Sequence, residues 1–294
     1  MNNSIFETLK KLGLTSETTR TLFNDKTRDI KDLKVWKDSA SQIIYIDEFY
    51  VSEEEYIDGS YRDDKIYELG APKSNFDSES DAQRRLKANL KHVAGKKLLD
   101  FGCGSGDFLK LVKPYCSEVS GIELQQSYID LLTSDGISCA NNLNNIEDNS
   151  LDIVVSFHTL EHLPNPLEVL EELKSKIVSG GQILIEVPHA KDFLLSSLGC
   201  NEFKQFTLWS QHLVLHTRES LRKTLEYVGF KDIQIDGVQR YPLSNHIHWL
   251  ANGMPGGHKS LLSALDSDDL NKSYHNSLAR IDATDTLVAI AIVP

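Results

Sequence analysis

Residues 98–108 read LLDFGCGSGDF and combine a short apolar run with three glycines in alternate positions. The apolar run predicts a buried strand over residues 97–101, and the residues after the glycines predict a helix over 107–115. Glycine tolerates positive backbone φ angles, and the first turn of a helix has unpaired N–H groups, so a ligand can approach such a turn closely. A strand, a glycine turn and a helix in this order indicate an α/β domain.

The same alternation of strand and helix continues toward the C-terminus. Strands are predicted at residues 118–123, 137–140, 151–157, 182–187, 232–238 and 286–293, and helices at 126–133, 166–179 and 218–228. Nearly all-apolar strands between amphipathic helices are typical of a parallel sheet that is covered on both faces. We therefore predict a doubly wound α/β fold with a mostly parallel sheet, whose ligand-binding residues follow the carboxyl ends of its strands.

The chain divides into four predicted parts. Residues 1–80 form an N-terminal accessory region, in which two short helices are expected at 5–12 and 16–24 and a strand at 43–46. Residues 81–238 form the core, and residues 239–283 form a helical lid inserted before the last strand. Residues 284–294 return to the core as that last strand.

Composition and charge narrow the class of protein. The 294 residues include 40% apolar and 25% charged types, which is typical of a globular protein. With 31 Lys and Arg against 43 Asp and Glu, the formal net charge of -12 disfavours nucleic acid and anionic membranes as partners. No apolar run reaches the ~18 residues that span a bilayer, no secretory signal is recognisable, and the four cysteines form no C-x-x-C pair. We expect a cytoplasmic protein with reduced thiols and no membrane insertion; its oligomeric state stays open.

Acidic side chains beside the glycine turn indicate which ligand it takes. The dinucleotide-binding fingerprint has a small residue at its sixth position, where Asp107 would instead repel a diphosphate. Asp100 ends the first strand and suits a ligand with positive charge, and Glu123 ends the second strand, where a carboxylate can accept hydrogen bonds from ribose hydroxyls. A nucleoside with a cationic tail fits this combination, and S-adenosylmethionine is such a molecule.

These residues resemble the motifs of a known enzyme family. Residues 99–106 are similar to the first motif of the class I, seven-stranded S-adenosylmethionine-dependent methyltransferases, and residues 151–163 and 180–188 to their fourth- and fifth-strand segments. The resemblance covers about residues 96–238 and implies a seven-stranded sheet, a methyltransferase activity and S-adenosylmethionine as the cofactor. It implies adenine contacts near residues 142–144. The further cofactor-binding residues that it implies are Asp100, Gly102, Gly104 and Gly106 for the methionine end, Glu123 for the ribose, and Leu124 and Phe157.

A second resemblance concerns the methyl acceptor. Residues 208–217 are similar to a Glu-His segment of sugar methyltransferases from deoxysugar and polysaccharide pathways, whose histidine acts as the base. His212 matches that histidine, and Gln211 stands in place of the acid. The lid carries Arg240, His246 and other polar and aromatic residues of the kinds that line a carbohydrate site. We predict catalytic roles for His212 and His246 and no metal site.

The sequence thus predicts an enzyme that methylates a hydroxyl of a small sugar or nucleotide-linked sugar in glycan biosynthesis. One alternative acceptor is a quinone or another small aromatic hydroxyl compound. A second alternative is a non-catalytic member of the family that binds the cofactor to support a partner protein. A third, a nicotinamide-dependent sugar oxidoreductase, requires binding of NAD.

Overall fold

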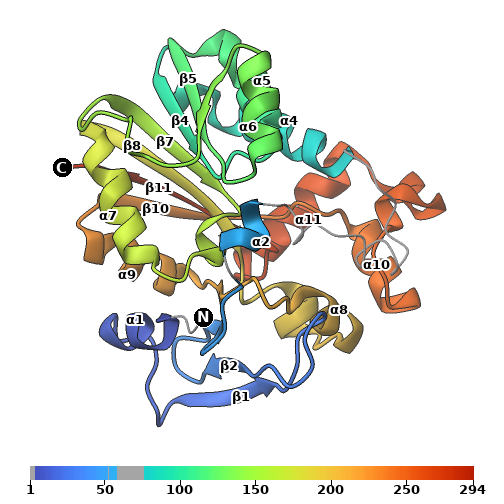
Figure 1. Cartoon of the computed structure of the whole chain (residues 1–294). Helices are drawn as coiled ribbons and strands as arrows, with labels where there is room; N and C mark the ends of the chain where they lie inside the picture. The colour runs from blue at the N-terminus through green and yellow to red at the C-terminus, as the bar shows by residue number, and fades with distance from the viewer. Residues whose placement is uncertain (1–3, 52, 58–75) are drawn as a thin grey trace.

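A seven-stranded sheet forms the centre of the computed structural model, which describes residues 4–51, 53–57 and 76–294 (Figure 1). Its strands lie in the order β10-β11-β8-β7-β4-β5-β6, and their bounds are β4 Lys97–Phe101, β5 Glu118–Ile122, β6 Ser138–Ala140, β7 Leu151–Phe157, β8 Ile177–Pro188, β10 Lys231–Val238 and β11 Thr286–Ile292. Neighbouring strands from β6 to β8 pair in parallel, and β11 pairs antiparallel with both β8 and β10. The predicted mostly parallel α/β sheet is confirmed.

Helices cover both faces of this sheet because its strands send alternate side chains to opposite sides. Leu99 and Val154 belong to one hydrophobic cluster, together with α7 (Pro166–Lys176) and α9 (Arg218–Val228). Leu98 and Ile153 belong to the other, together with three further helices. These are α4 (Phe76–Val93), α5 (Asp107–Val112) and α6 (Gln126–Ser134).

The boundary between α7 and β8 differs from the prediction. The spacing of leucines predicts a helix up to Gly180, but α7 ends at Lys176 and β8 begins at Ile177. Ile177 pairs with Leu151 of β7 and is fully buried, so strand pairing outweighs the helical periodicity at this position. Gly180 and Gly181 then lie where the β7–β8 register shifts.

The accessory region folds around a second, smaller sheet. Helix α1 (Ile5–Lys11) precedes it, and α2 (Glu53–Ile57) follows. Strands β1 (Arg20–Asn24), β2 (Val35–Asp38) and β3 (Ile44–Ile46) form an antiparallel sheet with β9 (Val214–Leu215). The helix predicted over residues 16–24 is wrong, because residues 20–24 pair with β2 as an edge strand. The strand predicted at 43–46 is confirmed, and residues 58–75 of the predicted accessory region lie outside the described residues.

The segment before the last strand is helical, as predicted. It contains α10 (Leu243–Asn252), two short 3₁₀ turns and α11 (Asp268–Arg280). Backbone N–H groups of Arg240 and Tyr241 donate to the Asp285 carboxylate, which fastens the start of this insertion to the beginning of β11. The short helix α8 (Asn201–Thr207) precedes β9. Across the described ranges, no helix is both long and apolar enough to cross a membrane.

Candidate active site

The glycine turn between β4 and α5 is packed from two sides. Gly102 has φ +80°, and a side chain there would bring its Cβ within 2.2 Å of Thr159 Oγ1 in the loop after β7. Gly106 has φ +74°, and its Cβ would lie 2.2 Å from Leu132 in α6. Only glycine fits these two positions, because both the left-handed backbone and the close neighbours exclude a side chain. The sequence therefore fixes a tight turn at the carboxyl edge of the sheet.

Glu123 follows β5 and is held by backbone N–H groups on both carboxylate oxygens. Gly104 N donates to Oε2 at 2.8 Å, and Leu124 N donates to Oε1 at 2.8 Å. Gln125 N also donates to Oε1, at 3.0 Å. The carboxylate thus joins the glycine turn to the start of α6 and keeps a fixed orientation. It retains acceptor capacity, since a carboxylate offers about four lone-pair positions.

Asp100, the residue before Phe101 in β4, is a buried carboxyl group. Asp100 is only 2% exposed, and among the described residues no group forms a hydrogen bond with its Oδ1. Burial raises the pKa of Asp100 to about 7; Arg85 lowers it and Glu123 raises it further. A cationic ligand nearby would favour the ionised form of this carboxyl group.

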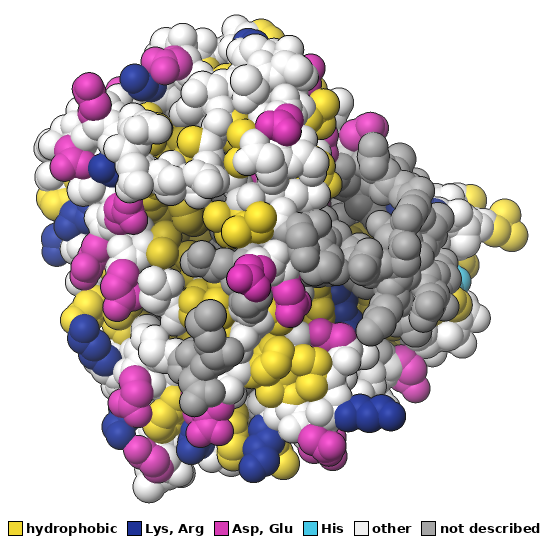
Figure 2. All heavy atoms as spheres, viewed as in Figure 1, with side chains coloured by type: hydrophobic (Ala, Val, Ile, Leu, Met, Phe, Trp, Pro, Cys, Tyr) yellow, Lys and Arg dark blue, Asp and Glu magenta, His cyan; other side chains and the backbone are white. Residues whose placement is uncertain are grey.

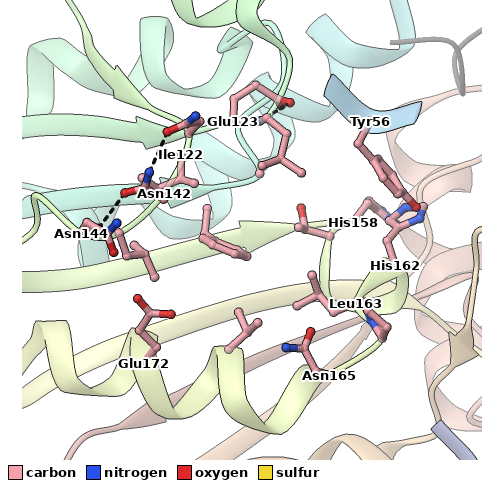
Figure 3. A pocket seen from close by; sticks show the side chains of 18 of the residues that line it. Tyr56, Ile122, Glu123, Asn142, Asn144, His158, His162, Leu163, Asn165 and Glu172 are labelled. Carbon is pink, nitrogen blue, oxygen red and sulfur yellow. Dashed lines mark hydrogen bonds between the residues drawn. The ribbon is translucent and has the colours of Figure 1, made fainter. Parts of the chain in front are cut away.

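A pocket of about 540 Å³ opens beside Glu123 at the carboxyl ends of the strands. Figure 3 shows Asn142 and Asn144 at one end of it and Tyr56 and His162 at the other, and Figure 2 shows hydrophobic side chains in a hollow on this face. Its volume is typical of small-molecule sites. The other residues that line it are Tyr50, Phe101, Gly102, Ile122, Leu124, Asn141, Leu143, His158, Thr159, Leu163, Pro164, Asn165, Val169 and Glu172.

The predicted cofactor residues fall into two groups around this pocket. Gly102, Glu123 and Leu124 line it, and so do the residues at 142–144. Asp100, Gly104 and Gly106 lie in the same strand and turn, but behind the lining. Phe157 also lies behind it: its ring contacts Phe108 at 4.9 Å between centroids. The guanidinium of Arg85 lies 4.4 Å from the centre of the Phe157 ring.

His158 directly follows β7 and lies near Tyr56 and His162, at what we call the aromatic end of the pocket (Figure 3). Its backbone has φ +53°, which is unusual for a residue with a side chain. Its ring contacts Glu161 Oε1 at 3.1 Å and Glu186 Oε1 at 3.3 Å. Burial and Arg240 lower the pKa of His158, but the two carboxylates outweigh them and raise it. This histidine is therefore held in an ion network between two sheet strands and the lid.

Glu161 and His162 form part of the short 3₁₀ turn η3 (Leu160–His162), and His212 lies against them. His162 Nδ1 lies 2.9 Å from the carbonyl oxygen of Gln211, so Nδ1 carries a proton and donates it. The rings of His162 and His212 are 5.0 Å apart between centroids. Burial, and then His162, lower the pKa of His212 to about 3. Burial, the largest single effect, raises the pKa of Glu161, but the hydrogen bond with His158 and the charges of the neighbouring histidines together outweigh it and bring the value to about 2.

Glu161 was absent from the residues singled out by sequence, although a signal for it existed. His158, Glu161 and His162 occupy positions i, i+3 and i+4 after a buried strand, and such a spacing places side chains on one turn. What no pattern in the sequence indicates is the contact of this turn with His212, which comes from a segment about fifty residues away.

The structure places His246 away from the pocket lining. It lies in α10, where Nδ1 is 2.6 Å from the Tyr274 hydroxyl and the ring stacks on Phe193. Burial lowers the pKa of His246 to about 4. Arg240 is likewise engaged, since its guanidinium forms an ion pair with Asp81 of α4. His246 thus links α10 to α11, and Arg240 links the start of the insertion to α4.

The chain is similar to known methyltransferases. A family model described as a methyltransferase domain matches residues 77–235, which is more than half of the chain. A tRNA U34 carboxymethyltransferase of Idiomarina loihiensis is 29% identical over 220 residues, which cover 69% of this chain and 65%, just under two thirds, of that protein. A ubiquinone biosynthesis O-methyltransferase of Thiobacillus denitrificans is 30% identical over 180 residues, covering 54% of this chain and 78% of that protein.

Solved structures agree on the fold. An S-adenosylmethionine-dependent methyltransferase from Archaeoglobus fulgidus superposes with a TM-score of 0.52 at 21% identity, over 73% of this chain and 94% of that one. At this level of identity the likeness concerns the arrangement of helices and strands.

Proposed function

The chain belongs to the class I S-adenosylmethionine-dependent methyltransferases, and from that premise we propose that it methylates a hydroxyl group of a small acceptor. One observation carries the proposal. Glu123, at the predicted ribose position, and His158 and His162, which can handle protons, line one continuous pocket. A cofactor and an acceptor bound at its two ends would be neighbours.

The residues around the glycine turn suit the cofactor. In this proposal Glu123 accepts hydrogen bonds from the ribose hydroxyls, and residues 142–144 flank the adenine. The buried carboxyl group of Asp100 has an acceptor atom without a partner among the described residues, as a cationic ligand requires. When bound, S-adenosylmethionine supplies the electrophilic methyl group. The chain contributes position: a bound acceptor oxygen has to lie ~3–3.5 Å from the carbon that it attacks.

The aromatic end of the pocket suits the acceptor. Tyr50 and Tyr56 line this end together with His158 and His162. Methylation of a hydroxyl releases a proton, and the two histidines at this end of the pocket can take or direct it. Because His162 donates Nδ1–H to Gln211, its neutral ring has Nε2 as the proton-accepting nitrogen. His212 contacts His162 from behind and would fix its orientation. We assign no role in the reaction to His246.

We place an aromatic hydroxyl compound first among possible acceptors. Tyrosine and histidine rings line the acceptor end, and ring faces pack well on a flat aromatic body. One group of relatives is named for ubiquinone biosynthesis. The polar lid residues Gln239 and Arg240, which favoured a carbohydrate in the sequence analysis, are instead engaged with Asp285 and Asp81.

A sugar hydroxyl is the second candidate. It is favoured by the likeness of residues 208–217 to sugar methyltransferases and by the contact of His212 with a histidine that lines the pocket. The name of another relative points to tRNA. We do not extend that substrate to this chain, because a net charge of -12 repels a phosphate backbone.

An acceptor screen tests the proposal. The protein is incubated with S-adenosylmethionine and, separately, a set of catechols and quinols and a set of sugars and nucleotide sugars, and products are detected by mass spectrometry. We expect methylated product from the aromatic set. His162→Ala should lower the rate by about 100-fold or more while calorimetry still detects S-adenosylhomocysteine binding. His92→Ala, on α4, is the matched control.

Two results would contradict the proposal. Binding of S-adenosylhomocysteine without methylation of any compound in either set would favour the non-catalytic alternative. Heat of binding with NAD but none with S-adenosylhomocysteine would favour the oxidoreductase.

A further inference from the structure

Three side chains with metal-binding atoms meet behind the aromatic end of the pocket. They are Glu161, His162 and His212, and one ligand atom from each lies within 4.8 Å of those of the other two. Glu161 and His162 come from the turn after β7, and His212 comes from the segment before β9. The proposed reaction uses His162 and the contact of His212 with it, but it gives no role to the buried carboxylate of Glu161 beside them.

Two of these side chains have buried polar atoms without partners. Glu161 is 0% exposed, and among the described residues no group hydrogen-bonds its Oε2. Nδ1 of His212 is buried and, within the same ranges, also lacks a hydrogen bond. Buried polar atoms are normally hydrogen-bonded, so each of these two atoms lacks a partner that folded proteins usually provide. A cation between them would satisfy both.

The other contacts of the three side chains orient them toward a common point. The ring of His158 forms a hydrogen bond with Oε1 of Glu161, so Oε2 is left for another partner. His162 donates Nδ1–H to the Gln211 carbonyl, and histidine ligands commonly donate their second nitrogen to a backbone carbonyl in this way. The backbone also holds the two segments together, since Leu213 N donates to Glu161 O at 2.8 Å. The cluster is thus largely assembled without the cation.

We propose that Glu161, His162 and His212 bind a divalent transition-metal cation. Two imidazole nitrogens and one carboxylate oxygen form a donor set that suits Zn²⁺ and related ions better than Mg²⁺ or Ca²⁺. Three protein ligands also leave a fourth position of a tetrahedral ion open. The sequence pattern predicted no metal site, because the pair His246 and His248 has no further ligand at a metal-binding spacing.

The site has a consequence for the reaction, and this step rests on the proposed function. His162 also lines the pocket, so the three side chains adjoin its acceptor end, and in this proposal the open position of the cation faces that end. A cation there lowers the pKa of a hydroxyl group that it binds and so promotes loss of its proton. The acceptor oxygen would then attack the methyl group as its proton leaves to solvent. In this metal-bound form Nε2 of His162 binds the cation, because Nδ1 is engaged with Gln211, so His162 holds the cation and does not itself take the proton.

Direct binding of Co²⁺ tests the site without any acceptor. The full chain, with any polyhistidine tag removed, is treated with a chelator, dialysed and titrated with Co²⁺, whose visible absorption reports its coordination. We expect absorption to saturate at one Co²⁺ per chain and Zn²⁺ to displace it. Glu161→Gln and His212→Ala should each weaken binding by more than about 10-fold. His248→Ala, in α10, should leave binding unchanged.

The outcomes separate the site from the reaction. Absence of saturable Co²⁺ binding to the wild-type chain overturns the metal site, whatever the variants do. Equal binding by wild type, Glu161→Gln and His212→Ala, each with a cooperative unfolding transition, also overturns it. A metal-loaded chain that binds Co²⁺ as expected but methylates no acceptor contradicts the proposed function and leaves the site standing.

Discussion

At the scale of single residues, Glu123 connects two segments of the proposed cofactor site. Its carboxylate accepts hydrogen bonds from Gly104 in the glycine turn and from Leu124 and Gln125 before α6. A glutamine in its place would turn an N–H₂ group toward backbone N–H donors, and the turn would lose its anchor. Charge-assisted hydrogen bonds of this kind are each worth about 1.5–3 kcal/mol.

We therefore predict that Glu123→Gln weakens S-adenosylhomocysteine binding by about 10- to 100-fold, as measured by titration calorimetry. Glu118→Gln, at the start of β5, provides a matched control, because the Glu118 side chain is 57% exposed. Its affinity should equal that of the wild type. Equal affinities for all three proteins would show that Glu123 does not organise the cofactor site.

The raised pKa of the Asp100 carboxyl group should make the stability of the protein depend on pH. Its pKa is about 7 in the folded chain against an ordinary 3.8, so between these values the folded state binds more protons than the unfolded state. Stability of the wild type then falls as pH rises from about 4 to about 7 and levels off above. Asp100→Asn removes this loss and should gain stability relative to the wild type over that range, by up to roughly 4 kcal/mol.

Urea denaturation of both proteins at several pH values checks this difference. A free-energy difference between Asp100→Asn and wild type that does not change with pH would mean that the buried carboxyl group titrates normally. Because the two proteins differ only at position 100, the titration of the histidines contributes equally to both and cancels in the difference.

The sequence predicts single residues well where backbone geometry or charge limits the choice. Gly102, Glu123 and Leu124 all line the pocket, and their contacts with the cofactor stay a prediction. His246 is an exception: its polar neighbours in sequence suggested a substrate site, but Tyr274 and Phe193 enclose it. The sequence carries no signal for such enclosure, because both neighbours belong to other elements.

At the scale of elements, α9 illustrates a boundary that sequence predicts correctly. Thr217 accepts a hydrogen bond from Ser220 N, and the Ser220 hydroxyl accepts one from Thr217 N, which forms a capping box. Gly229 ends the helix in a left-handed conformation. Local hydrogen bonds define both ends, so local residues suffice to predict them.

Removing the cap should destabilise the protein modestly. We predict that Thr217→Ala lowers the free energy of unfolding by about 1 kcal/mol, because Ser220 N loses its acceptor. Thr217→Ser keeps the hydroxyl and should stay close to the wild type in the same urea titration. A loss of equal size in both variants would attribute the effect to packing of the methyl group instead.

Strand β5 contains a glycine whose missing side chain makes room for the glycine turn. A Cβ at Gly121 would lie 2.6 Å from Cys103 Sγ. We predict that Gly121→Ala displaces the turn, weakens S-adenosylhomocysteine binding by about 10-fold and lowers stability by about 1–3 kcal/mol. Calorimetry and urea denaturation measure the two effects.

The double variant tests the cause. Gly121→Ala combined with Cys103→Ala removes the clashing sulfur and should recover most of the lost affinity. If Gly121→Ala alone binds as tightly as the wild type, the close contact does not control the turn.

Other element boundaries depend on partners that are distant in sequence. The end of α7 is set by pairing of Ile177 with Leu151, and β1 is a strand because residues 20–24 pair with β2. Helical periodicity read along one segment cannot reveal such pairing.

At the scale of the whole molecule, one strand of the accessory sheet comes from the segment that connects two strands of the seven-stranded sheet. Strand β9 lies between β8 and β10 in sequence but pairs with β3 of the accessory sheet. Val214 of β9 and the preceding Leu213 pack with Ile5, Ile43 and Tyr45 in one hydrophobic cluster. The accessory sheet is therefore completed by a segment that also carries His212.

A shortened chain tests this dependence. We predict that residues 76–294 expressed alone bind a hydrophobic dye strongly and unfold over a broad transition, because β9 and its apolar neighbours lose their partners. The full chain should bind little dye and unfold in one sharp step. A shortened chain with the same sharp transition and S-adenosylhomocysteine affinity as the full chain would show that the accessory sheet is dispensable.

The two-residue strand β9 also limits how this protein can be recombined with its relatives. A graft that exchanges only residues before α4 as a cassette would leave the recipient's β9 facing a foreign edge. Since His212 lies two positions before that strand, the mismatch would be transmitted to the histidine cluster. A successful chimera has to carry both the N-terminal segment and residues 208–217 from the same parent.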